Sequence, residues 1–235
     1  FSSEGLRVDA SIHAFACPLA PSRISSKIPA APMILCLREP VSRAFSHWKM
    51  IIDTEEDSRN GADWSDFSVA WQDDRLSGDS HYGRAMRRWL EHFPLEQFLI
   101  IDSQRMRNDP EGVLEEVEGF LGLQNHPYDL DPSRHANSAT DRRPITNVGR
   151  VVRSVFSLIP NIIKRPIVNR LQARDINIYA APIVSRRAVK LSAGPEHYSI
   201  CAESLRPDLE NFESITGFDT SHWAQSIETN RQKSS

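Results

Sequence analysis

The stretch that decides the fold is Met33–Trp48, which reads MILCLREPVSRAFSHW. Its first five residues form a continuous apolar run bounded by turn-prone prolines, a pattern typical of a buried parallel strand. Pro40 suits the first position of a helix, because the N–H that proline lacks is not needed there. The apolar residues that follow recur at helical spacing. The stretch therefore predicts a strand that turns within two residues into an amphipathic helix.

A second unit, Tyr82–Leu123, repeats this theme in reverse order. Its apolar residues first recur at helical spacing up to Pro94, and Phe98–Ile101 is then a second buried-strand run. The pair Asp109–Pro110 predicts a helix start, and Gly122 predicts a left-handed helix end. Strands that alternate with helices predict an α/β fold with a mostly parallel sheet.

The C-terminal half is predicted to be mainly helical. We expect one amphipathic helix over residues 148–159 and a last helix that begins near Glu196. No internal repeat or low-complexity linker divides the chain, so we predict a single domain over residues 1–235. The polar tail at residues 224–235 is expected to be frayed. Because the chain begins with Phe1, we expect an N-terminal portion to be missing.

Composition and hydropathy exclude several classes of protein. The chain has 235 residues, of which 40% are hydrophobic and 25% charged, as in an ordinary soluble globular protein. No apolar run approaches the roughly 18 residues that a membrane span needs, so we predict no transmembrane segment. The cysteines lie far apart without a CxxC pair, which argues against both a disulfide framework and a metal site. They are Cys17, Cys36 and Cys201.

The net charge of −3 hides a strongly basic segment. Arg134–Lys190 carries 12 cationic and 2 acidic side chains, so it sums to +10 and the rest of the chain to −13. Such a segment favours an anionic ligand, and the alternative is a solvated, arginine-rich face. Nucleic acid ranks last among the anions, because the chain is slightly acidic overall and the aromatic residues of the segment are isolated.

Arg38, Arg43 and Ser46 are the candidate ligands of an anion. In open α/β sheets, ligands bind beyond the carboxyl ends of the strands, and Arg38 lies at such an end. Arg43 and Ser46 fall away from the apolar stripe of the predicted helix, so the core does not need them. Ser46 lies about 9 Å beyond the helix start, given a rise of about 1.5 Å per residue. A phosphate that contacts both Arg38 and Ser46 must therefore lie alongside the first two turns; the alternative is an exposed helix with ordinary surface arginines.

The motif Leu37–Trp48, LREPVxRAxSxW, resembles the 3′-phosphate-binding strand and helix of the PAPS-dependent sulfotransferases, especially the heparan-sulfate-type and bacterial carbohydrate branch. PAPS is the sulfuryl donor 3′-phosphoadenosine 5′-phosphosulfate. The resemblance implies that Arg38 and Ser46 hold the 3′-phosphate and that Arg43 assists. It also implies a P-loop-NTPase-like three-layer sandwich with a mostly parallel sheet and a helical C-terminal part. Two later stretches are similar to the same family, Tyr82–Leu123 and Leu205–Trp223.

The chain departs from this family near its start. Members carry a strand and a glycine-rich loop, typically Lys-x-Gly-Thr-Thr, that wraps the 5′-phosphosulfate. Nothing here matches that loop, and no lysine precedes Lys27, so we expect the loop to be lacking. Val8–His13 is placed like the short strand before the 3′-phosphate motif of the family. Asp9 and His13 are therefore the candidates for the catalytic base, and a structural role on the strand is the alternative for each.

These patterns predict an enzyme that moves a sulfuryl group from PAPS to a hydroxyl or amine of a carbohydrate or small metabolite, without a metal. Arg142 and Arg143 fall where the family has a basic loop that closes over the nucleotide, and a surface turn is the alternative. A non-catalytic module that binds a nucleotide or an anionic glycan is the second interpretation of the whole chain. A bacterial member is expected in the cytoplasm, and a heparan-sulfate-type enzyme in the Golgi lumen.

Overall fold

The computed structural model describes residues 8–11, 13–54, 61–130 and 192–233. The chain divides into two compact units. The first unit comprises Phe1–Trp48, Asp63–Leu130 and Ala193–Ser235, and the second comprises Lys49–Ala62 and Asp131–Ser192. The single domain predicted over residues 1–235 stays a prediction.

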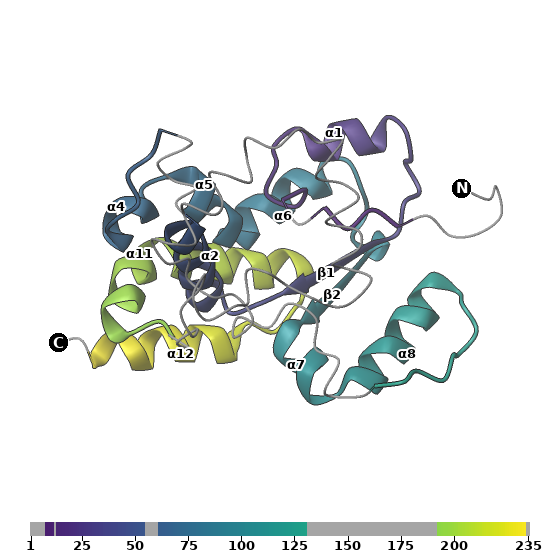
Figure 1. The fold of residues 1–235 in the computed structure, drawn as a ribbon. Helices are drawn as coiled ribbons and strands as arrows, with labels where there is room; N and C mark the ends of the chain where they lie inside the picture. The colour runs from purple at the N-terminus through teal and green to yellow at the C-terminus, as the bar shows by residue number, and fades with distance from the viewer. Residues whose placement is uncertain (1–7, 12, 55–60, 131–191, 234–235) are drawn as a thin grey trace, which may run out of the picture. The chain divides into compact units, whose positions relative to one another are not determined.

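Two parallel strands lie side by side in the first unit, β1 (Met33–Leu37) and β2 (Phe98–Asp102) (Figure 1). Their register runs from Met33 opposite Phe98 to Leu37 opposite Asp102, so both strands end at the same edge of the sheet. The predicted parallel pairing is confirmed. One face of β1 is less buried than predicted, because alternate residues of a strand point to opposite faces and both Ile34 and Cys36 are exposed.

Helices make up most of the rest of the described chain, which confirms the α/β class and the helical C-terminal part. Those before β2 are α1 (Ala20–Ser25), α2 (Pro40–Thr54), α4 (Phe67–Trp71), α5 (Asp74–Ser77), η1 (Gly78–Ser80), α6 (Tyr82–Leu90) and η2 (Leu95–Gln97). Those after it are α7 (Ser103–Asn108), α8 (Pro110–Leu121), α11 (Pro195–Thr216) and α12 (Ser221–Gln232). Among these helices, none is long and apolar enough to cross a membrane.

The predicted helix boundaries are confirmed where local chemistry sets them. Helix α2 begins at Pro40 directly after the strand. The Asp109 carboxylate accepts the Gly112 N–H at 3.1 Å and caps α8, which ends at Gly122 with φ of 66°. That left-handed conformation is readily available to glycine and costs other residues free energy.

Helix α11 packs against both α6 and α12 and fixes the start of α6. The two Asp208 carboxylate oxygens accept the backbone N–H groups of Gly83 and Arg84, each at 2.8 Å. A Cβ at position 83 would lie 2.3 Å from the Asp208 carbonyl oxygen, so this close approach of α6 and α11 requires glycine. Helix α11 is thereby joined to α6.

Two expectations about the ends of the chain are wrong. Residues 224–232 are not frayed, because they belong to α12, where Trp223 is 2% and Ile227 4% exposed. These two residues lie four apart and bury one face of the helix, a pattern that its polar residues hid.

The described part of Val8–His13 is not a strand: the Asp9 carboxylate accepts the Ser11 N–H at 2.8 Å in a local turn. The helix expected over 148–159 lies outside the described residues.

Candidate anion site at the end of strand β1

The backbone at Arg38 is held by a buried tyrosine. The Tyr82 hydroxyl, on the first residue of α6, donates to the Arg38 carbonyl oxygen at 2.7 Å. Tyr82 is 2% exposed, and this burial raises the pKa of its hydroxyl, which therefore stays a proton donor at neutral pH. The end of β1 is thus a fixed point from which the Arg38 side chain extends.

The Arg38 guanidinium is partly buried, and no described carboxylate is bonded to it. Burial lowers the pKa of Arg38, and the neighbouring charge of Arg107 lowers it further, against smaller effects of Glu39 and two tyrosines. Among the described residues, none forms a hydrogen bond or ion pair with this guanidinium. A cation removed from water without a partner costs free energy, and an anionic ligand offsets that cost. The site therefore fits a phosphate or sulfate group.

Glu39 closes the N-terminus of α2 to such an anion. Its two carboxylate oxygens accept the N–H groups of Val41 at 3.0 Å and Ser42 at 2.7 Å. The Tyr198 hydroxyl of α11 donates to the same carboxylate at 3.3 Å. Because the helix end is already filled by a carboxylate, an anion bound by Arg38 has to lie alongside α2. The placement of a phosphate alongside the first two turns, predicted from the spacing of Arg38 and Ser46, stays a prediction.

Ser46 lies on the second turn of α2. The side chain is partly exposed and makes no hydrogen bond with any residue that the structure describes. Ser42, one turn earlier, instead lies 3.4 Å from the Tyr198 hydroxyl. No direct contact joins Ser46 to Arg38, so their joint role as phosphate ligands stays a prediction.

Arg43 does not fit its predicted role as a nucleotide ligand, because its guanidinium is already occupied. Nε donates to the Ser80 hydroxyl at 2.8 Å, Nη2 to the Leu76 carbonyl at 2.7 Å and Nη1 to Asp79 at 3.3 Å. Burial lowers the pKa of Arg43, as expected for a guanidinium removed from water. Arg43 ties α2 to α5 and η1, and helical periodicity gave no sign of partners more than 30 residues away.

The two candidates for a catalytic base have different surroundings. His13 Nδ1 lies 3.2 Å from the Asp79 carboxylate, while its side chain is 66% exposed. Its ring centroid is 5.9 Å from that of His47. The Asp9 carboxylate is bonded to Ser11, and these bonds lower the pKa of Asp9, which makes it a weaker base. Only His13 therefore has a carboxylate that orients it.

Sequence reasoning missed another histidine–carboxylate pair, which lies at the end of β2. His222 Nε2 lies 2.7 Å from Asp102 Oδ2. The other Asp102 oxygen accepts the Gln104 N–H at 2.6 Å and caps α7. An acid between a strand and a helix was a readable signal for the cap, but nothing local indicates a partner 120 residues away.

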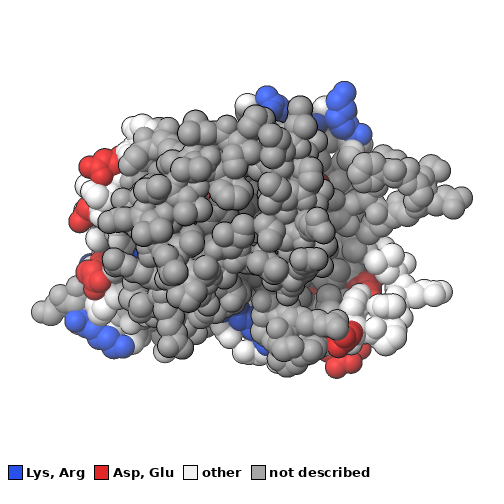
Figure 2. All heavy atoms as spheres, in the orientation of Figure 1, with Lys and Arg blue, Asp and Glu red and all other residues white. Residues whose placement is uncertain are grey.

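The predicted basic residues Arg142 and Arg143, and the whole segment Arg134–Lys190, lie outside the described residues. On the face drawn in Figure 2, the described basic side chains and the described acidic side chains form separate small groups. In the part of the chain open to description, no group of three or more His, Cys, Asp or Glu side chains has the arrangement of a metal site.

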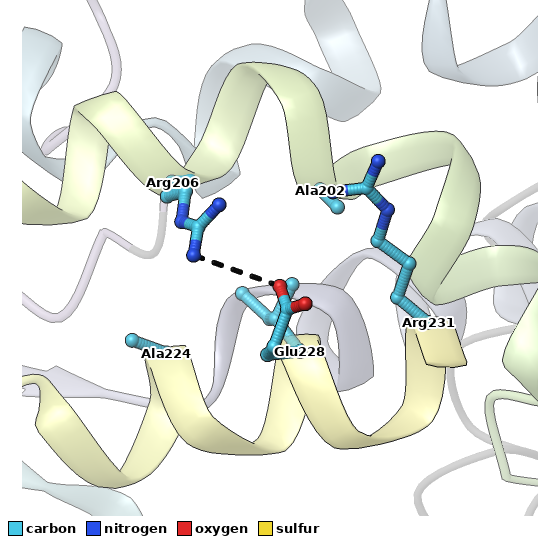
Figure 3. Close-up of a pocket in the computed structure, with 6 residues that line it drawn as sticks. Ala202, Arg206, Ala224, Glu228 and Arg231 are labelled. Carbon is cyan, nitrogen blue, oxygen red and sulfur yellow. Dashed lines mark ion pairs between the residues drawn. The ribbon is translucent and has the colours of Figure 1, made fainter. Parts of the chain in front are cut away.

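A small pocket between α11 and α12 contains none of the predicted ligands. Figure 3 shows Arg206 extending toward Glu228, and their charged atoms lie 3.7 Å apart. Both side chains are exposed, so this ion pair contributes little. The pocket is lined by Ala202, Arg206, Ala224, Ile227, Glu228 and Arg231.

Comparison with known proteins places this chain in a family. The family described as "Sulfotransferase domain" matches residues 11–142. Heparan sulfate glucosamine 3-O-sulfotransferase 3B1 of Mus musculus is 33% identical over 109 residues, which cover 45% of this chain and 28% of that protein. Bifunctional heparan sulfate N-deacetylase/N-sulfotransferase 3 of Homo sapiens is 34% identical over 118 residues, which cover 46% of this chain and 13% of that protein. The aligned part is thus under a third of either relative.

A solved structure supports the same assignment at the level of the fold. The crystal structure of a sulfotransferase from Alicyclobacillus acidocaldarius has a TM-score of 0.53 and 17% identity, over 91% of this chain and 65% of that one. This likeness concerns the fold, whereas the family match covers more than half of the sequence and includes Arg38 and Ser46. The chain belongs to the sulfotransferase domain family, as the motif Leu37–Trp48 predicted.

Proposed function

We propose that the protein transfers a sulfuryl group from PAPS to a hydroxyl or amine of a carbohydrate. The observation that carries the proposal is the partly buried Arg38 guanidinium, which has no bonded partner among the described residues and lies at the carboxyl end of a parallel strand. The two relatives compared above are named as enzymes that sulfate heparan sulfate, which favours a carbohydrate acceptor. A bacterial source would place the protein in the cytoplasm, and a heparan-sulfate-type eukaryotic source in the Golgi lumen.

In this proposal Arg38 and Ser46 bind the 3′-phosphate of the donor. A guanidinium holds phosphate with two parallel hydrogen bonds, and the Ser46 hydroxyl adds a donor alongside α2. Glu39 keeps the phosphate away from the helix end, because its carboxylate already accepts the first N–H groups of α2. Arg142 and Arg143 are proposed to assist from outside the described residues.

His13 is proposed as the base that accepts the proton of the acceptor hydroxyl. Nδ1 of His13 lies beside Asp79, so Nε2 is the ring nitrogen left to take that proton. PAPS, when bound, supplies the sulfuryl group: the acceptor oxygen forms the new bond to sulfur, the bond from sulfur to the 5′-phosphate breaks, and 3′,5′-ADP leaves. No metal takes part in the proposal.

Calorimetric titration of 3′,5′-ADP and 5′-AMP into the chain tests the phosphate site. We expect 3′,5′-ADP to bind more tightly, and Arg38→Ala to weaken it about 10- to 100-fold, the effect of about 1.5–3 kcal/mol for a hydrogen bond to a charged group. Ser46→Ala should weaken it about 3- to 10-fold, the effect of a typical hydrogen bond of about 1 kcal/mol. The matched control is Arg206→Ala, which removes an exposed arginine of α11.

The outcomes separate the interpretations. A preference for 3′,5′-ADP that disappears in Arg38→Ala but persists in Arg206→Ala supports the proposal. Equal binding of the two nucleotides by every variant would remove Arg38 as a 3′-phosphate ligand, and the proposal would fail for this chain. Binding with the expected preference, but no sulfation of any glycan by the full-length protein, would favour the non-catalytic module.

A further inference from the structure

The turn that begins at His13 is bonded to helix α6 through its backbone. The carbonyl oxygen of Phe15 accepts the indole N–H of Trp89 at 2.9 Å. The next carbonyl oxygen, that of Ala16, accepts Nη2 of Arg88 at 2.7 Å. Both donors belong to the last turn of α6, so two neighbouring peptide groups of the turn are joined to one helix end.

The ring of Trp89 is itself fixed in the core. Trp89 is 4% exposed, and its ring centroid lies 5.7 Å from that of Phe93 and 6.1 Å from that of Phe98. An indole has one donor and no acceptor, and leaving a buried donor unfilled costs free energy. The Trp89 N–H therefore has a defined direction, and the turn that carries His13 supplies its acceptor.

The imidazole of His13 is held by a residue that lies just before the same helix. Nδ1 of His13 is 3.2 Å from Oδ2 of Asp79, which belongs to η1. Asp79 also accepts Nη1 of Arg43 at 3.3 Å, so the carboxylate is fixed from a second side. An ionised carboxylate only accepts hydrogen bonds, so Nδ1 has to carry the ring proton when this contact is a hydrogen bond.

Helix α6 also holds the end of β1. Its first residue, Tyr82, donates to the Arg38 carbonyl oxygen at 2.7 Å. Tyr82 and Trp89 lie seven residues apart, which is about two turns and about 10 Å along the helix, so both side chains leave its same face. The ring centroids of Tyr82 and Phe15 are 6.4 Å apart. One helix thus contacts the backbone of the candidate phosphate ligand at its start and that of the candidate base at its end.

We propose that Trp89 is a positioning residue, whose indole N–H, together with Arg88, holds the turn of His13 so that the imidazole stays beside Asp79. This inference rests on the proposed function and deepens it, because it names what places the base. The His13 side chain is 66% exposed, and a single contact of an exposed group restrains it weakly. Bonds that fix its backbone before the acceptor binds lower the entropy cost of reaching the reactive geometry.

The test compares Trp89→Phe with the matched control Trp48→Phe. Trp48 also donates its indole N–H to a backbone carbonyl, that of Trp64 at 2.7 Å, so each variant loses one such bond and keeps an aromatic ring. Nitrogen NMR of the isotope-labelled chain at about pH 8.5, above the range in which histidine usually titrates, reports which nitrogen of the His13 ring carries the proton.

We expect Trp89→Phe to lower the ratio of Nδ1-protonated to Nε2-protonated His13 rings about 3-fold, a part of the effect of one lost hydrogen bond. Trp48→Phe should change this ratio less than about 1.5-fold, because its bond ends elsewhere. Arg88→Met removes the second donor and keeps the apolar stem, so a smaller decrease is expected. It tests the same inference if Trp89→Phe does not fold, which thermal unfolding of each variant shows.

Sulfation of a glycan by the full-length protein gives the second measurement. We expect Trp89→Phe to lower kcat about 10-fold, while its affinity for 3′,5′-ADP stays within about 2-fold because the contacts of Arg38 are kept. A smaller kcat with an unchanged nucleotide affinity supports a positioning role, since a general loss of structure would lower both.

The outcomes separate this inference from the proposed function. If Trp89→Phe and Trp48→Phe leave the same His13 ratio, the positioning role of Trp89 is overturned, and the indole bond serves the core alone. If His13→Gln abolishes sulfation while Trp89→Phe keeps its full kcat, the base stands and the inference is again overturned. If the ratio falls in Trp89→Phe but His13→Gln sulfates as fast as the parent chain, the turn is held as inferred and the proposed base fails.

Discussion

Arg38 and Arg43 belong to one motif, five residues apart, yet their surroundings are opposite. At the end of β1, Arg38 is partly buried with no bonded partner among the described residues. At the contact of α2 with α5 and η1, Arg43 donates to a hydroxyl, a carbonyl and a carboxylate. The comparison shows that two arginines of one motif can differ in whether described residues fill their donors.

The same contrast recurs on α7 and in the acids around the site. Arg105 is paired with Glu116, whereas Arg107 has no bonded partner in the described ranges. Glu39 and Asp102 lie close to the site, but the carboxylate of each caps a helix and makes one further contact. Among the described residues, this edge thus combines two arginines without bonded partners and two carboxylates whose oxygens are bonded.

The largest effect that would sharpen the comparison is expected for Arg43→Ala. It leaves Asp79 and Ser80 without their guanidinium partner, and we expect the free energy of unfolding to fall by about 2–4 kcal/mol. Urea unfolding followed by circular dichroism measures this loss. Arg38→Ala is the matched control and should change stability by less than about 0.5 kcal/mol. Equal losses in the two variants would break the comparison.

A smaller effect is expected for Tyr82→Phe, which removes the hydroxyl that holds the Arg38 carbonyl. A typical lost hydrogen bond costs about 1 kcal/mol of unfolding free energy. We also expect 3′,5′-ADP to bind about 2- to 3-fold more weakly, because Arg38 then leaves a less fixed backbone. Tyr198→Phe is the control, since its hydroxyl contacts Glu39 and not Arg38. Loss of stability with unchanged affinity would show that the backbone bond does not position Arg38.

The smallest effect concerns an exposed arginine with a filled guanidinium, Arg75. Its hydrogen bonds are the main cause that lowers the pKa of Asp73 to about 2, helped by the Trp64 N–H. Because this pKa is below the ordinary value of about 3.9, the ionised carboxylate stabilises the fold above about pH 4, and that stability is lost as the pH falls toward 2. Asp73→Asn should therefore cost about 0.5–1 kcal/mol at pH 6 and much less at pH 2.5.

Unfolding of the parent chain and Asp73→Asn at the two pH values measures this difference. A loss that is the same at pH 6 and pH 2.5 would assign it to packing instead of charge. A loss as large as that of Arg43→Ala would show that exposed and buried arginine pairs contribute alike in this fold, contrary to the comparison.

Local sequence determined the elements that carry the site. The apolar run Met33–Leu37 predicted β1, Pro40 predicted the start of α2, and Asp109 and Gly122 predicted the ends of α8. These features depend on neighbours within one turn or one strand, so a single sequence contains them. The motif also identified Arg38 and Ser46 as candidate ligands, and no described residue is bonded to either side chain.

Only the tertiary structure decided which charged groups are available. The occupied donors of Arg43, the Tyr82 bond to Arg38 and the cap that Asp208 gives to α6 all join residues far apart in the sequence. The burial of Trp223 in a helical tail has the same origin. Helical and strand periodicity record which face of an element is apolar, but not which distant polar group meets the other face. The packing of the elements determines which distant polar groups meet. It therefore also determines which polar side chains form intramolecular bonds.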